Sequence, residues 1–108
     1  MADYLLVESQ GPWAGPACRR FLDDALALAA MGHRVWLFLV EDGVTGVVGR
    51  TDAPLDDALC AGVRVWVDTF SLRRRALPDT ALGAGTELVD IEKLAGKLLE
   101  PAVRVVWH

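Results

Sequence analysis

The sequence lacks most of the features that mark membrane, secreted or metal-binding proteins. No apolar run reaches the length of about 18 residues that a membrane-spanning helix needs. The N-terminal segment opens with an acidic residue and has no basic region followed by a long apolar one, so we expect no signal peptide. The two cysteines, Cys18 and Cys60, are too few for a disulfide framework and do not have metal-ligand spacing. These absences predict a cytoplasmic protein that binds no metal and no membrane.

Phosphate-binding motifs and basic stripes are also missing. The glycine-rich segments 9–16 and 41–50 match neither of the common phosphate-cradling patterns. The chain has 15 acidic and 11 basic side chains, a formal net charge of -4, and such a surface repels phosphate backbones. We therefore expect no cofactor and no nucleic-acid partner.

The sequence does contain enough apolar residues for one packed domain. Hydrophobic residues make up 53% of its 108 residues and charged residues 24%, which argues against disorder. This length fits one domain, residues 1–108, and leaves no room for a second core. The apolar fraction is high for so short a chain, and it indicates that partners cover part of the apolar surface.

Strand-like and helix-like segments alternate along the chain. Short apolar runs predict five strands, at 3–8, 34–41, 63–68, 87–90 and 102–107. Helical patterns predict helices at 16–31, 55–62, 69–77 and 91–99, with Pro16 at the start of the first and Gly32 after its end. Segment 41–50 reads as a loop or weak helix, and 79–85 as a loop. Because strands joined by helical crossovers run parallel, the fold class is α/β: a three-layer, flavodoxin-like α/β/α sandwich with a mainly parallel five-stranded sheet of undetermined order.

The two cysteines differ in their predicted surroundings. In open parallel sheets, ligands and chemistry collect outside the carboxyl ends of the strands. Cys18 falls on that edge, in the first turn of a helix, where the helix dipole stabilises a thiolate. Cys60 falls at the end of a helix on the opposite edge, where the dipole disfavours one. Chemistry is therefore expected at Cys18 if at either, although a small buried hydrophobe is the commonest role of a free cysteine.

Several polar residues share the carboxyl edge with Cys18. Trp13, Asp42, Asp68 and Ser71 are candidate binding residues there. Asp68 is also well placed to cap the helix that begins at Thr69, and we favour that interpretation. An acid/base pair of Glu41 and Asp42 competes with the simpler hypothesis of a solvated acidic loop.

Basic residues and histidines give weaker indications. Arg73, Arg74 and Arg75 read as a solvated helix end, or as a docking patch for an acidic partner. His33 precedes a strand on the opposite edge and His108 ends the sequence, so neither is expected to serve as a base for Cys18.

Three segments resemble the DsrE/DsrF/DsrH-like family of sulfur-relay (Tus-type) proteins. They are MGHRVWLFLVEDGV, AGVRVWVDTFSLRRRAL and TELVDIEKLAGKLLEPAVRVVW, the last of which is similar to the DsrH branch. In the family's catalytic members, a cysteine just after the third strand, at a helix N-terminus, accepts persulfide sulfur. Here that position is Asp68, the next candidate is Ser71, and Ala76 stands where glycine is usual. A carboxylate cannot carry a persulfide, so the resemblance does not transfer a catalytic residue.

The family resemblance and the carboxyl-edge residues together leave three hypotheses for the role. The leading hypothesis is a non-enzymatic structural or regulatory subunit in a homo- or hetero-oligomer with DsrE-like subunits. A second is a sulfurtransferase or sulfur carrier that uses Cys18 and receives sulfur from a donor protein. A third is a small-ligand binding module that uses the loops around Trp13, Asp42 and Asp68.

Overall fold

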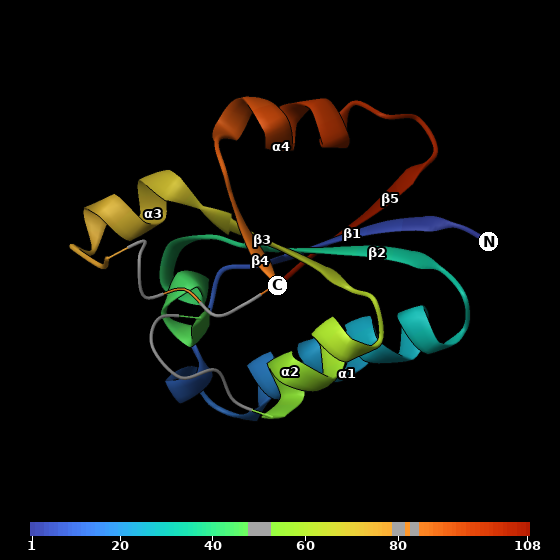
Figure 1. The fold of residues 1–108 in the computed structure, drawn as a ribbon, viewed down its shortest axis with the longest axis horizontal. Helices are drawn as coiled ribbons and strands as arrows, with labels where there is room; N and C mark the ends of the chain where they lie inside the picture. Colours follow the sequence, from blue (N-terminus) through green and yellow to red (C-terminus); the bar gives the residue numbers. More distant parts are fainter. Residues whose placement is uncertain (48–52, 79–81, 83–84) are drawn as a thin grey trace.

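A five-stranded parallel sheet forms the centre of the computed structural model, which describes residues 1–47, 53–78, 82 and 85–108 (Figure 1). The strands are β1 (Asp3–Glu8), β2 (Arg34–Leu39), β3 (Arg64–Asp68), β4 (Thr86–Val89) and β5 (Val103–Trp107). The α-helices are α1 (Pro16–Ala30), α2 (Ala53–Cys60), α3 (Thr69–Arg74) and α4 (Ile91–Leu98). Two 3₁₀ helices, η1 (Pro12–Ala14) and η2 (Glu41–Val47), follow β1 and β2. The predicted α/β class, layers and parallel strands are confirmed.

The strand order is β4-β3-β2-β1-β5. From β1 the chain adds β2, β3 and β4 on one side, and then returns past β1 to add β5 on the other. The order therefore reverses between β1 and β5, and at such a point the loops diverge and leave a crevice outside the carboxyl ends. Figure 1 shows α1 and α2 on one face of the sheet and α4 on the other, while α3 lies at the carboxyl edge.

Alternation along the strands produces two apolar cores. Along β2, Val35, Leu37 and Leu39 pack toward α1 and α2, while Trp36 and Phe38 pack toward the α4 face. All five are buried, as a strand covered on both faces requires. Among the described residues, α4 is the one helix that covers the other face, and Phe70, Ile91 and Trp107 at the carboxyl end of that face remain exposed.

β2 ends at Leu39, earlier than the sequence pattern predicts. Glu41 has φ 53, a left-handed conformation that no strand continues. The predicted strand over 34–41 is thus wrong at its end, because the backbone turns at Glu41 into η2. The predicted loop or weak helix over 41–50 is a 3₁₀ helix up to Val47; the rest lies outside the described residues, as does most of the predicted loop over 79–85.

Positive φ angles mark the ends of the first two long helices. Gly32 (φ 89) follows α1, as predicted, and Gly62 (φ 94) follows α2. Glycine adopts this conformation without a Cβ clash. After α3, however, the corresponding left-handed residue is Ala76, with φ 52.

We expect Ala76→Gly to raise the free energy of unfolding by about 0.5–1 kcal/mol, because it relieves the left-handed strain of a Cβ-bearing residue. The same change at the exposed helical Ala27 should lower that free energy by about 1 kcal/mol. Urea denaturation of both variants checks the prediction. A loss of stability in Ala76→Gly would show that the alanine is not strained.

Candidate functional site

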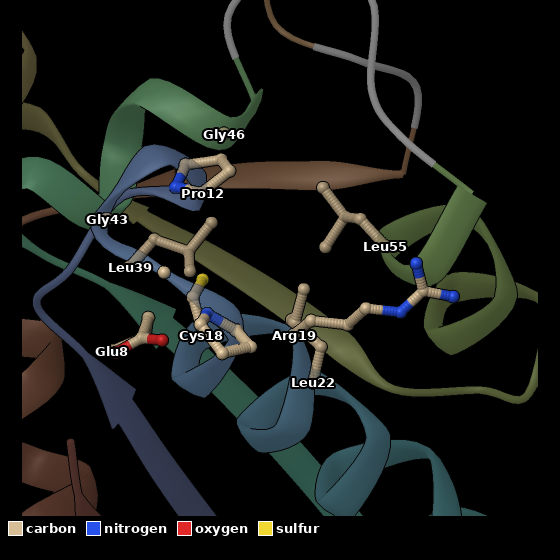
Figure 2. Close-up of a pocket in the computed structure, with 11 residues that line it drawn as sticks. Glu8, Pro12, Cys18, Arg19, Leu22, Leu39, Gly43, Gly46 and Leu55 are labelled. Carbon is tan, nitrogen blue, oxygen red and sulfur yellow. The ribbon is translucent and has the colours of Figure 1, made fainter.

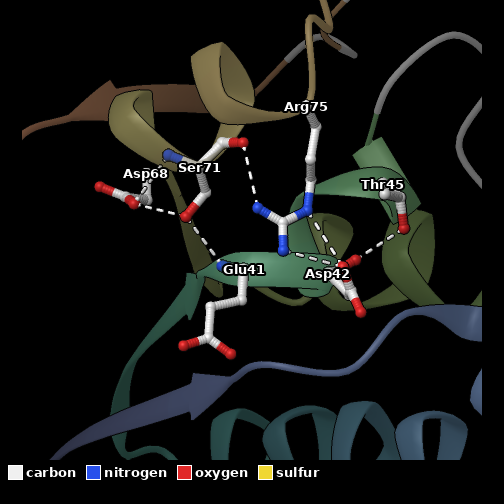
Figure 3. A network of polar contacts seen from close by, with 6 residues as sticks. All are labelled: Glu41, Asp42, Thr45, Asp68, Ser71 and Arg75. Carbon is white, nitrogen blue, oxygen red and sulfur yellow. Dashed lines mark hydrogen bonds and ion pairs between the residues drawn. The ribbon is translucent and has the colours of Figure 1, made fainter.

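Asp68 ends β3 and caps α3 at the position where catalytic relatives are expected to have cysteine. Its Oδ2 accepts hydrogen bonds from the Ser71 backbone N–H (3.0 Å) and from Ser71 Oγ (2.5 Å). Both residues are buried, with 6% and 3% of their surface exposed. Ser71 Oγ in turn accepts the backbone N–H of Glu41 at 2.8 Å (Figure 3). The predicted cap is confirmed, and it also fixes the turn at the end of β2.

An ion pair extends this network to the surface. Arg75 donates through Nε and Nη2 to Asp42 Oδ1, at 3.0 and 2.8 Å, and through Nη1 to the Ser71 carbonyl at 3.3 Å. The Asp42 carbonyl accepts the Thr45 hydroxyl at 2.6 Å. We call Glu41, Asp42, Thr45, Asp68, Ser71 and Arg75 the Asp68 network (Figure 3). Its polar groups bond one another and join α3 to η2.

The four predicted binding residues do not form one site. Asp42, Asp68 and Ser71 meet in the Asp68 network. Trp13 lies in η1, 66% exposed, and has no part in that network. Of the two hypotheses for Glu41 and Asp42, the acid/base pair is not formed, because the Asp42 carboxylate accepts from Arg75. Both residues are exposed, as in the simpler hypothesis of a solvated acidic loop. Because Asp68 and Ser71 are buried and already bonded to each other, a structural role explains them better than ligand binding.

The three arginines at the end of α3 have different surroundings. Arg75 is held by Asp42, whereas Arg73 and Arg74 are exposed. The Arg74 guanidinium lies 5.9 Å from the centre of the Phe70 ring. Both predicted interpretations, a solvated helix end and a docking patch, stay open for Arg73 and Arg74.

The two cysteines have different environments. Cys18 is buried, with 6% exposed, in the first turn of α1, and its Sγ lies 3.7 Å from the Gln10 carbonyl. Cys60 is exposed at the last residue of α2. A buried hydrophobic role is therefore wrong for Cys60, because its side chain leaves α2 on the solvent side. Neither cysteine lies at the end of β3.

A cavity of about 370 Å³ opens between α1, η1, η2 and α2 at the carboxyl edge (Figure 2). We call it the Glu8 pocket. Its walls are mostly apolar, and one polar side chain is fully buried there: Glu8, with 0% exposed. The lining residues are Glu8, Pro12, Gly15, Pro16, Cys18, Arg19, Leu22, Leu39, Gly43, Gly46 and Leu55.

Glu8 has one partnered and one unpartnered oxygen. Its Oε2 lies 2.6 Å from His108 Nδ1 and 3.4 Å from the Gln10 backbone nitrogen. Its Oε1 is buried and has no hydrogen-bond partner among the described residues.

Sequence reasoning missed the pairing of Glu8 with His108. β1 and β5 are neighbours and Val7 lies opposite Trp107, so the two following residues meet. The His108 ring also stacks on Phe21, with centroids 5.1 Å apart. The signal was the position of each residue at the carboxyl end of a strand, but using it requires the strand order.

The opposite edge carries structural pairs. His33 Nδ1 accepts the Ala2 backbone N–H at 3.0 Å, which confirms its predicted location away from Cys18. Arg34 donates two hydrogen bonds to the Asp3 carboxylate. These hydrogen bonds, together with the negative charge of Asp3, raise the pKa of Arg34. Arg34 is exposed, so its guanidinium stays charged in any case.

Among the described residues, no group of three or more histidine, cysteine or carboxylate side chains has an arrangement that could hold a metal ion. No helix in the same part of the chain is both long and apolar enough to cross a bilayer.

An exposed apolar surface borders the Asp68 network on the α4 side. Three large side chains there are about two-thirds exposed: Phe70 (66%), Ile91 (68%) and Trp107 (63%). Two adjoining hollows, of about 380 and 670 Å³, share Asp68 and Ile91 in their walls. We call Phe70, Ile91 and Trp107 the edge patch. Exposed apolar patches of this kind mark interaction surfaces.

Comparison with known proteins identifies the family. A model of the DsrE/DsrF-like family matches residues 2–107. The chain belongs to the DsrE/DsrF-like family. It is also 31% identical over 101 residues to a protein named TusC homolog from Pseudomonas aeruginosa, in an alignment that covers 83% of this chain and 85% of that protein. The predicted sulfur-relay family is thus confirmed, while the DsrH-like character of the C-terminal segment stays a prediction.

Two solved structures have the same fold as this DsrE/DsrF-like chain. The crystal structure of the ychN protein from E. coli superposes with a TM-score of 0.86 at 22% identity, over 100% of both chains. The protein of unknown function MTH1491 from Methanobacterium thermoautotrophicum gives a TM-score of 0.83 at 12% identity, also over 100% of both chains. At these identities the likeness shows the fold alone.

Proposed function

We propose that this DsrE/DsrF-like protein is a non-catalytic structural or regulatory subunit of a cytoplasmic sulfur-relay oligomer. The observation that carries the proposal is the Asp68 network. Where a persulfide-carrying thiol would be needed, Asp68 and Ser71 are buried and bonded to each other and to the turn after β2. A carboxylate and a hydroxyl cannot hold sulfane sulfur, and their hydrogen bonds stabilise the edge of the sheet instead.

The edge patch supports the oligomeric part of the proposal. It places Phe70, Ile91 and Trp107 in contact with water, although large apolar side chains gain about 1.5–3 kcal/mol each on full burial. It also directly adjoins the position of the missing thiol, since Asp68 lines both of its hollows. A DsrE-like subunit that covers the patch would bury these side chains and lie against the Asp68 network.

We expect Ile91→Lys to prevent assembly, because it places a charge in the middle of the edge patch. Size-exclusion chromatography with light scattering measures the mass of the wild-type chain, alone and co-expressed with DsrE-like subunits from the same genome. The wild type should form a species heavier than 11.7 kDa in one of these samples, and Ile91→Lys should not.

The matched control is Ala27→Lys, which adds the same charge to an exposed residue of α1, on the other face of the sheet. It should assemble like the wild type. A wild-type chain that stays at 11.7 kDa in every sample would contradict the proposal, and so would equal assembly of Ile91→Lys.

A sulfur carrier that uses Cys18 is the second candidate. It is favoured by the position of Cys18 in the first turn of α1 and in the wall of the Glu8 pocket. The burial of that thiol opposes it, because a sulfur donor protein must reach the sulfur atom. We therefore rank it below the subunit role.

A further inference from the structure

The Glu8 pocket combines an apolar cavity with a buried acceptor that lacks a donor. Leu22, Leu39 and Leu55 form apolar walls around a space of about 370 Å³, within the range of small-molecule sites. Glu8 belongs to the lining, and Figure 2 shows an oxygen of its carboxylate directed toward Cys18 and the cavity. Nothing in the subunit proposal requires this pocket.

The unpartnered oxygen of Glu8 indicates that a ligand of this pocket would supply a hydrogen-bond donor. A buried polar atom without a hydrogen bond costs about 1–3 kcal/mol, and more when it is charged. His108 and the Gln10 backbone both lie against Oε2, which leaves Oε1 without a described donor. A molecule in the pocket that donates a hydrogen bond to Oε1 would remove this cost.

The position of Glu8 in the sheet agrees with a ligand role. Glu8 is the last residue of β1 and His108 follows β5, and the strand order reverses between these two strands. In open α/β sheets, ligands bind outside the carboxyl ends at this point. The same pocket has a glycine in its wall: Gly43 lies so close to the Glu8 backbone that a Cβ there would clash with the Glu8 carbonyl oxygen.

The chemistry of the unpartnered oxygen determines the class of ligand. Oε1 is a carboxylate oxygen beside apolar walls, so the ligand must supply a hydrogen-bond donor. A positively charged nitrogen donor forms hydrogen bonds about twice as strong as a neutral one. Figure 2 shows the Arg19 guanidinium toward the other end of the pocket, turned away from Glu8, where it would repel a second positive charge.

We infer that the Glu8 pocket binds a small organic ammonium ion with a compact apolar body. Its N–H group donates to Glu8 Oε1, and its apolar body lies against Leu22, Leu39 and Leu55. This site is distinct from the Asp68 network and lies on the other face of the sheet from the edge patch, so it can be occupied in an assembled subunit.

Nitrogen-15 NMR titrations of the full chain test the inference with three ligands that have the same phenyl ring and different polar groups. The ligands are benzylamine, benzyl alcohol and benzoate. Benzylamine should bind most tightly and shift the amide signals of Cys18, Leu22 and Gly43. Glu8→Gln should weaken its binding at least tenfold, whereas Glu87→Gln, a change to an exposed carboxylate on β4, should leave it unchanged.

Gly46→Val is the second variant and does not alter Glu8. A Cβ at Gly46 makes only ordinary contacts with the Pro12 ring, at 3.5 and 3.7 Å, so the larger side chain should narrow the pocket without unfolding the protein. It should also weaken benzylamine binding. Equal binding of benzyl alcohol and benzylamine, or an unchanged affinity in Glu8→Gln, would overturn the inference. So would the absence of any shift with benzylamine, which would mean that water alone satisfies Glu8.

Discussion

Gly43→Ala is expected to lower the free energy of unfolding by about 3 kcal/mol or more, the upper end of the cost of overpacking. Gly43 lies near the start of η2, directly against the end of β1, and its N–H donates to the Val40 carbonyl at 2.9 Å. A methyl group at Gly43 would clash with the Glu8 backbone carbonyl, which belongs to the sheet and cannot move alone. The clash must therefore displace η2, the segment that carries Asp42 and one wall of the Glu8 pocket.

The control for this variant is Gly46→Ala in the same 3₁₀ helix. Its new methyl group meets only the Pro12 ring at ordinary contact distance, so the free energy of unfolding should change by less than about 1 kcal/mol. Urea denaturation compares both variants with the wild type. Equal stability of the two would show that η2 does not lie as close to β1 as the structure has it.

Asp68→Ala should be the second most damaging change, with a loss of about 3 kcal/mol. The loss of an N-cap costs about 1 kcal/mol, and a buried donor left without an acceptor costs about 1–3 kcal/mol more. Here the Ser71 N–H and hydroxyl both lose their acceptor inside the protein. The effect should extend to η2, because Ser71 also holds the Glu41 backbone.

Asp90 provides the matched comparison, since it caps α4 in the same way but at the surface. Its Oδ1 accepts the Lys93 N–H at 2.9 Å, so Asp90→Ala should cost only about 1 kcal/mol. Asp68→Asn keeps an acceptor and should recover part of the stability. If Asp68→Ala proves no worse than Asp90→Ala in urea denaturation, the Asp68 network does not stabilise the edge of the sheet.

Local patterns predicted the elements of this fold because they depend on neighbours in sequence. Pro16 starts α1, Gly32 follows its end, and Asp68 and Asp90 cap helices three residues ahead of the N–H groups that they bind. Each of these features is decided within one helical turn. The alternation of strands and helices likewise determined the parallel sheet, whatever the strand order.

Features that depend on the strand order could not be predicted. Glu8 and His108 are 100 residues apart and meet only because β5 pairs with β1. The exposure of Cys60 depends on which way the last turn of α2 faces, and the end of β2 depends on a hydrogen bond to Ser71, 30 residues away. The cap at Asp68 was visible in the sequence, but its link to η2 was not.

The central claim is that this DsrE/DsrF-like chain does not carry sulfur, and intact-mass analysis tests it most directly. Cys60→Ala removes the exposed thiol, so only Cys18 can react. This variant and the Cys18→Ala/Cys60→Ala double variant are incubated with a persulfide donor, beside a DsrE-like subunit that carries the cysteine. We predict an added sulfur on that subunit and none on either variant. An added sulfur on Cys60→Ala that disappears in the double variant would contradict the account and make Cys18 the carrier.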